Sequence, residues 1–259
     1  MKVGILAGGM GSRLAEETVI KPKPMVEIGG KPILWHIMKH YACFGHKDFA
    51  IALGYKGEVI QKYMVDYCSL SGSMTVDLAA GRVQRHGTPD IDWRVDLIET
   101  GLHTQTGGRI KRLQPHMGNE TFLLTWGDGV SDVDLDDLVA FHKRHGKLAT
   151  VTAVRPPARF GRLDLDGDIV RSFEEKPQMS EGWINGAFFV LEPAIFDYIE
   201  GDKTHFEREP LENLARDGQL VAYRHEGFWQ CMDTLRDKVR LEQLWESGEA
   251  AWKTWEKRA

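Results

Sequence analysis

The sequence predicts an α/β fold with a mixed, mainly parallel sheet flanked by helices, added β-hairpins and a C-terminal helical tail. Residues 3–7 form a continuous apolar run closed by glycine, as expected for a strand buried on both faces. Such runs alternate with amphipathic helical patterns as far as residue 154, which predicts a parallel sheet covered on both sides. Beyond residue 154, strand-like runs follow one another across short polar turns, which predicts hairpins added to that sheet.

Local patterns predict the individual elements. Pro32 suits the first turn of a helix whose apolar face carries Ile33, Ile37 and Tyr41. Residues 66–101 alternate weakly and contain several glycines, which predicts an inserted hairpin or a mobile lobe, with a strand through residues 95–99. Apolar residues at helical spacing predict further helices at residues 59–64, 135–142 and from 235 onward. Strand-like runs predict further strands at residues 49–53, 121–126, 149–154, 161–165, 169–173 and 183–191.

Composition limits the partners and the compartment. At 259 residues and 42% hydrophobic, the chain is expected to fold as a single domain over residues 1–259. The balance of 33 basic against 38 acidic residues argues against nucleic acid or an anionic membrane as the main partner. No run approaches the ~20 apolar residues that span a bilayer, and the opening run is too short for a signal peptide, so we expect a cytoplasmic protein. Three scattered cysteines predict neither a disulfide framework nor a zinc site.

The glycine-rich loop behind the first strand predicts a phosphate site. The glycines of residues 8–11 permit the positive φ and the close approach that aim several backbone N–H groups at one anion. Arg13 can bind two phosphate oxygens and Lys23 adds a point charge, so the pair suggests a polyphosphate. A plain tight turn is the alternative. The spacing excludes a Walker loop, and Leu14 stands where a dinucleotide fingerprint needs a small residue.

The segment Lys21-Pro22-Lys23-Pro24 is predicted to hold a lysine in place. Proline on either side of Lys23 fixes the backbone and reduces the freedom lost when that lysine is positioned. A solvated basic loop is the alternative interpretation.

Two acids are candidate Mg²⁺ ligands. Asp128 follows an apolar strand, at the edge where parallel sheets bind ligands, and Asp233 precedes a predicted helix. Magnesium takes few carboxylates and completes its shell with water and phosphate oxygen. The alternatives are a turn-stabilising role for Asp128, and a helix N-cap formed by Asp233 or Thr234.

Two later segments could hold a sugar hydroxyl or a single phosphate. Glu175-Lys176-Pro177 and Asn185-Gly186 each place polar groups beside a predicted strand. Taken alone, they are equally consistent with a strand end and a hairpin turn.

Taken together, these motifs resemble the sugar-1-phosphate nucleotidylyltransferases in order and spacing along nearly the whole chain. The motifs are Leu6-Ala7-Gly8-Gly9-Met10-Gly11-Ser12-Arg13-Leu14, Lys21-Pro22-Lys23-Pro24, Gly127-Asp128, Glu175-Lys176-Pro177 and Asn185-Gly186. The branch of that family most similar is the cytidylyltransferases that act on glucose 1-phosphate, through Gly54-Tyr55-Lys56-Gly57, Thr106-Gly107-Gly108-Arg109 and Met232-Asp233-Thr234-Leu235-Arg236-Asp237. Ser12 stands where threonine is usual, and Cys231 where proline is familiar.

The resemblance implies a Rossmann-like sheet and an activity. The implied reaction is CTP plus glucose 1-phosphate giving CDP-glucose and pyrophosphate, with Mg²⁺ as cofactor, for the synthesis of dideoxyhexoses of bacterial O-antigen. It also implies a nucleotide-binding half over about residues 1–154, a sugar-phosphate-binding half over about 155–234 and a helical tail over about 235–259.

The resemblance also implies residue roles. Arg13 and Lys23 are the expected catalytic residues, and Asp128 and Asp233 the expected Mg²⁺ ligands. The expected sugar-phosphate residues are Glu175, Lys176, Asn185 and Gly186. The expected nucleotide-binding residues are Leu6, Ala7, Gly8, Gly9, Met10, Gly11, Ser12, Arg13, Lys23, Thr104, Thr106, Gly107, Arg109 and Gly127.

Base choice is predicted to rest on residues 104–109. Carbonyl groups freed by Gly107 and Gly108 could accept from N4 of cytosine, while Arg109 can only donate, to the base or to a phosphate. We therefore expect CTP to be preferred over dTTP. A thymidylyl-, uridylyl- or guanylyltransferase acting on a hexose 1-phosphate is the alternative within the family, and a sugar-nucleotide sensor or an NAD-dependent dehydrogenase is a remote one.

The C-terminal tail predicts self-association. Trp245, Trp252 and Trp255 lie in a short amphipathic segment that a single domain would have difficulty covering, so we expect a homo-oligomer. Docking of the tail on its own chain is the alternative.

Overall fold

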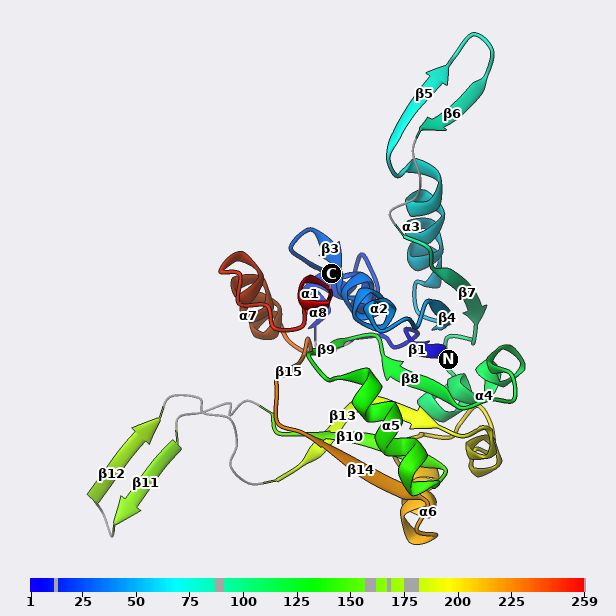
Figure 1. Ribbon diagram of the computed structural model, residues 1–259. Coiled ribbons are helices and arrows are strands. Elements are labelled where there is room, and N and C mark those ends of the chain that lie inside the picture. The colour runs from blue at the N-terminus through cyan, green and yellow to red at the C-terminus, as the bar shows by residue number, and fades with distance from the viewer. Residues whose placement is uncertain (12–13, 87–90, 157–161, 167–168, 175–181, 259) are drawn as a thin grey trace.

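The computed structural model describes residues 1–11, 14–86, 91–156, 162–166, 169–174 and 182–258. Its centre is a seven-stranded sheet in the order β14-β10-β13-β8-β1-β4-β7. Every neighbouring pair is parallel except the two that β13 makes with β10 and β8 (Figure 1). The strands are β1 (Lys2–Leu6), β4 (Asp48–Leu53), β7 (Arg94–Glu99), β8 (Phe122–Trp126), β10 (Ala149–Val154), β13 (Ile184–Leu191) and β14 (Leu220–His225). The predicted mixed, mainly parallel sheet is confirmed.

Helices cover both faces of the sheet, because alternate side chains of the central strands are apolar on both sides. In β1, Ile5 joins one buried cluster and Leu6 the other. The first cluster includes residues of α2 (Ile33–Cys43), α3 (Gly57–Leu70), α5 (Leu135–His145) and α7 (Leu235–Glu246). The second includes residues of α4 (Thr106–Met117), the 3₁₀ helix η3 (Pro193–Tyr198) and α6 (Glu209–Arg216).

Short two-stranded pieces are added to this body. Pairs β2 (Glu27–Ile28) with β3 (Lys31–Pro32), and β9 (Gly129–Ser131) with β15 (Trp229–Cys231), lie beside the sheet. In the segment 66–101, the end of α3 leads to an exposed hairpin of β5 (Ser73–Asp77) and β6 (Arg82–His86), and then to β7. Figure 1 shows this hairpin beyond the end of α3, away from the sheet. The predicted inserted hairpin is confirmed, as is the hairpin β11 (Arg162–Asp166) with β12 (Ile169–Glu174).

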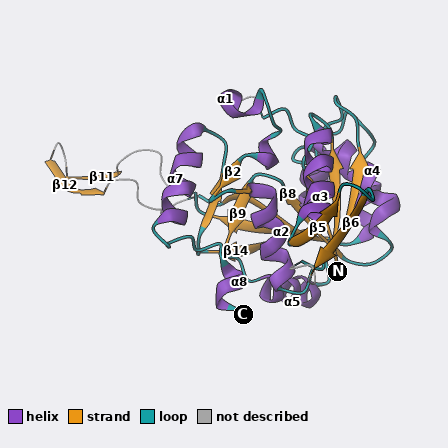
Figure 2. Ribbon diagram, turned by 90° about the horizontal axis from the view of Figure 1, so that it is seen from above, coloured by secondary structure: helices purple, strands orange, loops and turns teal. Residues whose placement is uncertain are grey.

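The C-terminal tail docks on its own chain. Trp252 is fully buried, and Trp245 packs so closely on Gly29 that a Cβ there would lie 2.0 Å from the indole nitrogen. Helix α7 contacts β2, and α8 (Thr254–Lys257) contacts α2 (Figure 2). The tail therefore gives no support to the expected homo-oligomer, since Trp252 is buried and Trp245 and Trp255 are partly buried against the core of the same chain.

Among the longer elements, α4, η3, α6 and β14 have no counterpart in the predicted ones, and neither do the short pieces α1 (Ala15–Thr18), η2 (Lys23–Met25), β2, β3 and β9. Helix α4 contains Gly107, Gly108 and Pro115, which are poor helix formers in a helix interior. Its first turn instead packs against residues 202–204, where a larger side chain than glycine would collide. Tertiary packing thus stabilises a helix whose local sequence is unfavourable. In the described part of the chain, no helix is long and apolar enough to cross a membrane.

Candidate active site

A cavity of about 410 Å³ opens at the carboxyl ends of β1 and β8, between η2 (Lys23–Met25) and the start of α4. This is the edge at which parallel α/β sheets bind ligands. The cavity is lined by Leu6, Ala7, Gly8, Gly9, Met10, Gly11, Lys23, Pro24, Leu102, His103, Thr104, Gln105, Thr106, Arg109, Trp126, Gly127, Asp128 and Asp233. Of the expected nucleotide-binding residues that the structure describes, all except Gly107 therefore lie at one site.

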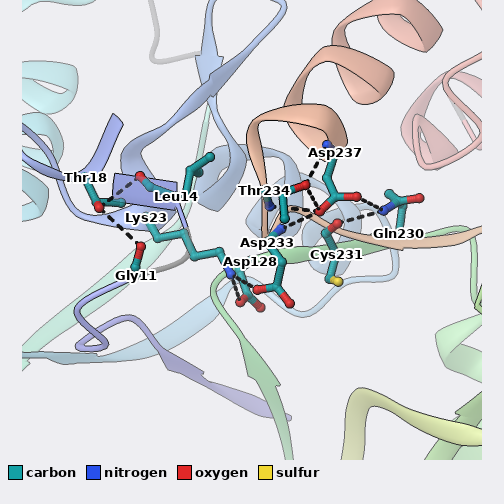
Figure 3. A network of polar contacts seen from close by, with 10 residues as sticks. All are labelled: Gly11, Leu14, Thr18, Lys23, Asp128, Gln230, Cys231, Asp233, Thr234 and Asp237. Atoms are coloured by element: carbon teal, nitrogen blue, oxygen red, sulfur yellow. Dashed lines mark hydrogen bonds and ion pairs between the residues drawn. The ribbon is translucent and has the colours of Figure 1, made fainter. Parts of the chain in front are cut away.

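The glycine loop is shaped by contacts that exclude larger side chains. A Cβ on Gly8 would lie 2.2 Å from Nη1 of Arg109, so glycine lets the loop pass close over that guanidinium. Gly11 has φ +62°, in the left-handed region, and its carbonyl accepts from the hydroxyl of Thr18 at 3.2 Å (Figure 3). Ser12 and Arg13 lie outside the described residues, so their expected roles remain predictions.

Lys23 lies between the two acids at the cavity wall. Its ammonium donates to Oδ2 of Asp128 at 2.7 Å and also forms an ion pair with Asp233 (Figure 3). Burial lowers the pKa of Lys23, but the two carboxylates outweigh it and the net pKa is raised. Lys23 is therefore charged at neutral pH. Lys21, by contrast, pairs with the exposed Glu27 and does not line the cavity.

The two acids come from distant segments and converge on one cation position. Asp128 follows β8, and Asp233 follows β15; the N–H of Met232 donates to the carbonyl of Asp128 at 2.8 Å and joins the segments. The N-cap of α7 is Thr234, which forms a capping box with Asp237, so the N-cap role left open for Asp233 falls to its neighbour.

This donor set fits a divalent metal. Two carboxylates beside a glycine-rich loop suit a hard cation whose remaining ligands are water and phosphate oxygen. Within the described ranges, no group of three or more His, Cys, Asp or Glu could hold a metal by itself.

In residues 104–109, the two glycines have a different role from the predicted one of freeing carbonyl groups for the base. Gly107 and Gly108 lie in the first turn of α4, and their amides donate to the carbonyl of Thr204. Their lack of a side chain serves the packing of α4 on residues 202–204, because a Cβ on Gly107 would lie 2.7 Å from that carbonyl oxygen. The explanation that these glycines free carbonyls for the base is not supported by this geometry.

Arg109 is buried, with 5% of its surface exposed, and its guanidinium is engaged by the protein. It donates to the carbonyls of Leu53 and Gly101 and to the hydroxyl of Thr100, at 2.9, 2.8 and 2.7 Å. It also donates to the carbonyl of Leu102 at 3.3 Å. Although Arg109 lines the cavity, these contacts show that it fixes the loop after β7 against the end of β4. Burial lowers its pKa from the ordinary value.

The expected sugar-phosphate residues do not join this cavity where the structure describes them. Asn185 is exposed and accepts from the amide of Ala187, and the carbonyl of Gly186 accepts from the indole of Trp229 at 2.8 Å. A Cβ on Gly186 would lie 2.7 Å from Val154, so this glycine allows β13 to lie close to β10. Glu175 and Lys176 lie outside the described residues. The sugar-phosphate assignment thus stays a prediction.

Sequence reasoning missed five lining residues: Pro24, Leu102, His103, Gln105 and Trp126. Trp126 had a usable signal, because it is the last residue of a strand that ends at the ligand edge and directly precedes Gly127-Asp128. Leu102 and His103 had none, since they belong to a loop that becomes a cavity wall only when α4 packs on the sheet.

Comparison with known proteins identifies the family. Residues 2–236 match the family model described as nucleotidyl transferase. The chain belongs to this family. It is 55% identical to the glucose-1-phosphate cytidylyltransferase of Salmonella typhi, over 99% of this chain and all of that protein. It is 46% identical to a probable glucose-1-phosphate cytidylyltransferase of Bacillus subtilis, over 98% of this chain and all of that protein.

Solved structures share the fold. HddC from Yersinia pseudotuberculosis superposes with a TM-score of 0.70 at 25% identity, covering 94% of this chain and 99% of that one. A UDP-glucose pyrophosphorylase complexed with UDP-glucose superposes with a TM-score of 0.68 at 15% identity, covering 95% and 98%. The nucleotidyl transferase family and the resemblance to cytidylyltransferases are confirmed, and the chain is an enzyme of the nucleotidyltransferase class.

Proposed function

We propose that this nucleotidyl transferase makes CDP-glucose and pyrophosphate from CTP and glucose 1-phosphate, with Mg²⁺ as its metal. The observation that carries the proposal is the 55% identity, over both full lengths, to a glucose-1-phosphate cytidylyltransferase. The cavity supports it, because a glycine loop, a charged lysine and two convergent carboxylates meet at the ligand edge. A supply of CDP-glucose for dideoxyhexoses of O-antigen is the expected use of the product.

The geometry suggests how the reaction proceeds. A phosphate oxygen of glucose 1-phosphate attacks the α-phosphorus of CTP, and the bond from that phosphorus to the departing pyrophosphate breaks in line. The sugar phosphate is already a nucleophile, so the enzyme needs no covalent residue; its task is to bring two polyanions together and offset the growing charge.

Each part of the site has a role in this scheme. The amides of residues 8–11, which line the cavity, would bind the triphosphate, and Lys23 would exchange carboxylate oxygens for oxygens of the α-phosphate. Asp128 and Asp233 would hold Mg²⁺, which when bound neutralises phosphate charge as a Lewis acid. Arg13 is proposed to bind the triphosphate as well, and the sugar phosphate is assigned to Glu175, Lys176, Asn185 and Gly186.

Several expectations accompany the proposal. The division into a nucleotide-binding half, a sugar-phosphate-binding half and a tail remains a prediction, as does a cytoplasmic location. A homo-oligomer is also still predicted, although the docked tail no longer argues for it. Light scattering at micromolar concentration decides this point, and a species of 29.4 kDa alone would contradict it.

The test is a substrate panel. CTP, dTTP, UTP, GTP and ATP are each offered with glucose 1-phosphate and Mg²⁺, and pyrophosphate release is measured. We expect CTP to give the highest kcat/KM, because the relatives at 55% and 46% identity are a glucose-1-phosphate cytidylyltransferase and a probable one. Equal use of dTTP or GTP would remove the base assignment and keep the nucleotidyltransferase. No pyrophosphate from any pair would overturn the proposal.

A further inference from the structure

The segment of residues 202–207, between η3 and α6, braces the start of α4. The amide of Gln105 donates to the carbonyl of Asp202 at 2.8 Å, and the amide of Gly107 donates to that of Thr204 at 2.9 Å. Arg112 and Asp202 add a two-point ion pair at 2.9 and 2.6 Å. The segment therefore lies against the back of the helix turn that forms one wall of the cavity.

Glu207, at the end of this segment, joins two walls of the cavity. Its Oε2 accepts from the hydroxyl of Thr106 at 2.5 Å, and its Oε1 accepts from the indole Nε1 of Trp126 at 3.2 Å. Thr106 begins α4, and Trp126 ends β8. Both residues line the cavity, whereas Glu207 does not.

Thr106 and Trp126, the two partners of Glu207, also make contacts with other residues. The hydroxyl of Thr106 accepts from the amide of Phe206 at 2.9 Å, so its donor is aimed at Glu207. The ring of Trp126 stacks on Phe189, with centroids 5.2 Å apart. The indole ring has a single donor, Nε1. By accepting from it, the carboxylate of Glu207 fixes the direction in which that edge of the Trp126 ring faces.

We propose that Glu207 is a positioning residue of the nucleotide site, which sets the spacing and orientation of Thr106 and Trp126. The proposal deepens the function above and rests on it, because it takes the cavity to be where CTP binds. Glu207 acts through its two partners and away from Lys23, Asp128 and Asp233, so it should affect CTP binding more than the chemical step.

The test combines substitutions at Glu207 with kinetics and direct binding. In Glu207→Ala, we expect KM and Kd for CTP to rise about 5- to 10-fold, as expected for lost hydrogen bonds to a charged group, with kcat changed less than about 2-fold. Glu207→Gln keeps one acceptor oxygen and should recover part of the affinity. Glu200→Ala removes an exposed glutamate of the same connection and serves as the matched control, with no expected change.

A double-mutant cycle with Trp126→Phe tests whether Glu207 affects CTP affinity through Trp126. This substitution keeps the ring and removes the indole donor. If Glu207 acts partly through Trp126, the double variant should lose less affinity than the product of the two single losses. Unchanged CTP affinity in Glu207→Ala, or fully multiplicative losses together with no recovery in Glu207→Gln, would overturn the proposal. A wild-type protein that binds no CTP by calorimetry would instead refute the proposed function.

Discussion

The cavity has a buried cation on each of two sides, and their partners differ. Lys23 contacts two carboxylate side chains, which can exchange it for a metal or move with a ligand. Arg109 contacts backbone carbonyls and a threonine hydroxyl that the sheet and its loops hold in place. Lining a cavity therefore does not make a cation a ligand-binding group. A lysine held by two acid side chains can take part in chemistry, while an arginine bound to backbone carbonyls fixes the wall.

The acids beside Lys23 should give the largest effect. Asp128→Asn and Asp233→Asn each remove a negative charge from the proposed metal position, so we expect Mg²⁺-dependent turnover to fall on the order of 10³-fold. Pyrophosphate release across a range of Mg²⁺ concentrations measures it. Asp66→Asn, which breaks an exposed ion pair with Lys62, is the control. Near-normal activity of Asp233→Asn at low Mg²⁺ would show that this acid is not a metal ligand.

Substitution of Lys23 should give the second largest loss of activity. Lys23→Ala should lower kcat by about 10²-fold, in line with loss of a positioned electrostatic donor, whereas Lys21→Ala should change it little. Both carboxylates then lose the charge of Lys23, so Mg²⁺ should raise the melting temperature of Lys23→Ala more than that of the wild type. Equal and mild losses in both lysine variants would mean that this segment is only a basic loop.

Arg109 should affect stability first and activity as a consequence. In Arg109→Ala the hydroxyl of Thr100 and the carbonyl of Gly101 lose the donor that Arg109 provides, while the carbonyl of Leu53 still accepts from Thr100. We expect the free energy of unfolding to fall by roughly 2–3 kcal/mol. Urea unfolding measures this loss, and kcat/KM for CTP should fall alongside it. Arg109→Lys keeps the charge but cannot reach all the acceptors, so it should recover little. Unchanged stability with lost CTP use would instead assign Arg109 to the ligand.

The smallest effect concerns a thiol beside the acids. Burial, followed by the charges of Asp233 and Asp128, raises the pKa of Cys231 to about 12. The thiol therefore stays protonated at pH 8, and iodoacetamide should modify it far more slowly than the exposed Cys68. Mass spectrometry of each peptide over time gives the rates. Asp233→Asn should accelerate the reaction at Cys231, and no acceleration would mean that burial alone protects it.

The sequence predicted those parts of the fold and site whose signals are local. A few neighbouring residues are enough to recognise each of these: the apolar run before Gly8, the periodic apolar faces of α2 and α5, and the acid after β8. Helix α4 was missed because Gly107 and Gly108 argue against a helix, and the contacts with residues 202–204 that favour it are remote in sequence.

The roles of Arg109 and Glu207 depended on information that no local pattern holds. The acceptors of Arg109 come from the end of β4 and from the loop after β7, so its hydrogen bonds are visible only once both segments are in place. Glu207 likewise has partners on α4 and β8, far from it in the chain. The docked tail is a third case, because the sequence shows an apolar helix but not the surface of α2 and β2 that covers it.

The capping of α7 by Thr234 has a consequence for synthesis on the ribosome. Helix α7 begins at Leu235, two residues after Asp233, and packs on Gly29 through Glu242 and Trp245. This packing holds Asp233 beside Lys23. A nascent chain that already carries the glycine loop, Lys23 and Asp128 still lacks this helix. The second acid therefore reaches the cavity only after nearly the whole polypeptide has emerged, and a prematurely terminated chain would be expected to hold the other cavity-lining residues without Asp233 in place.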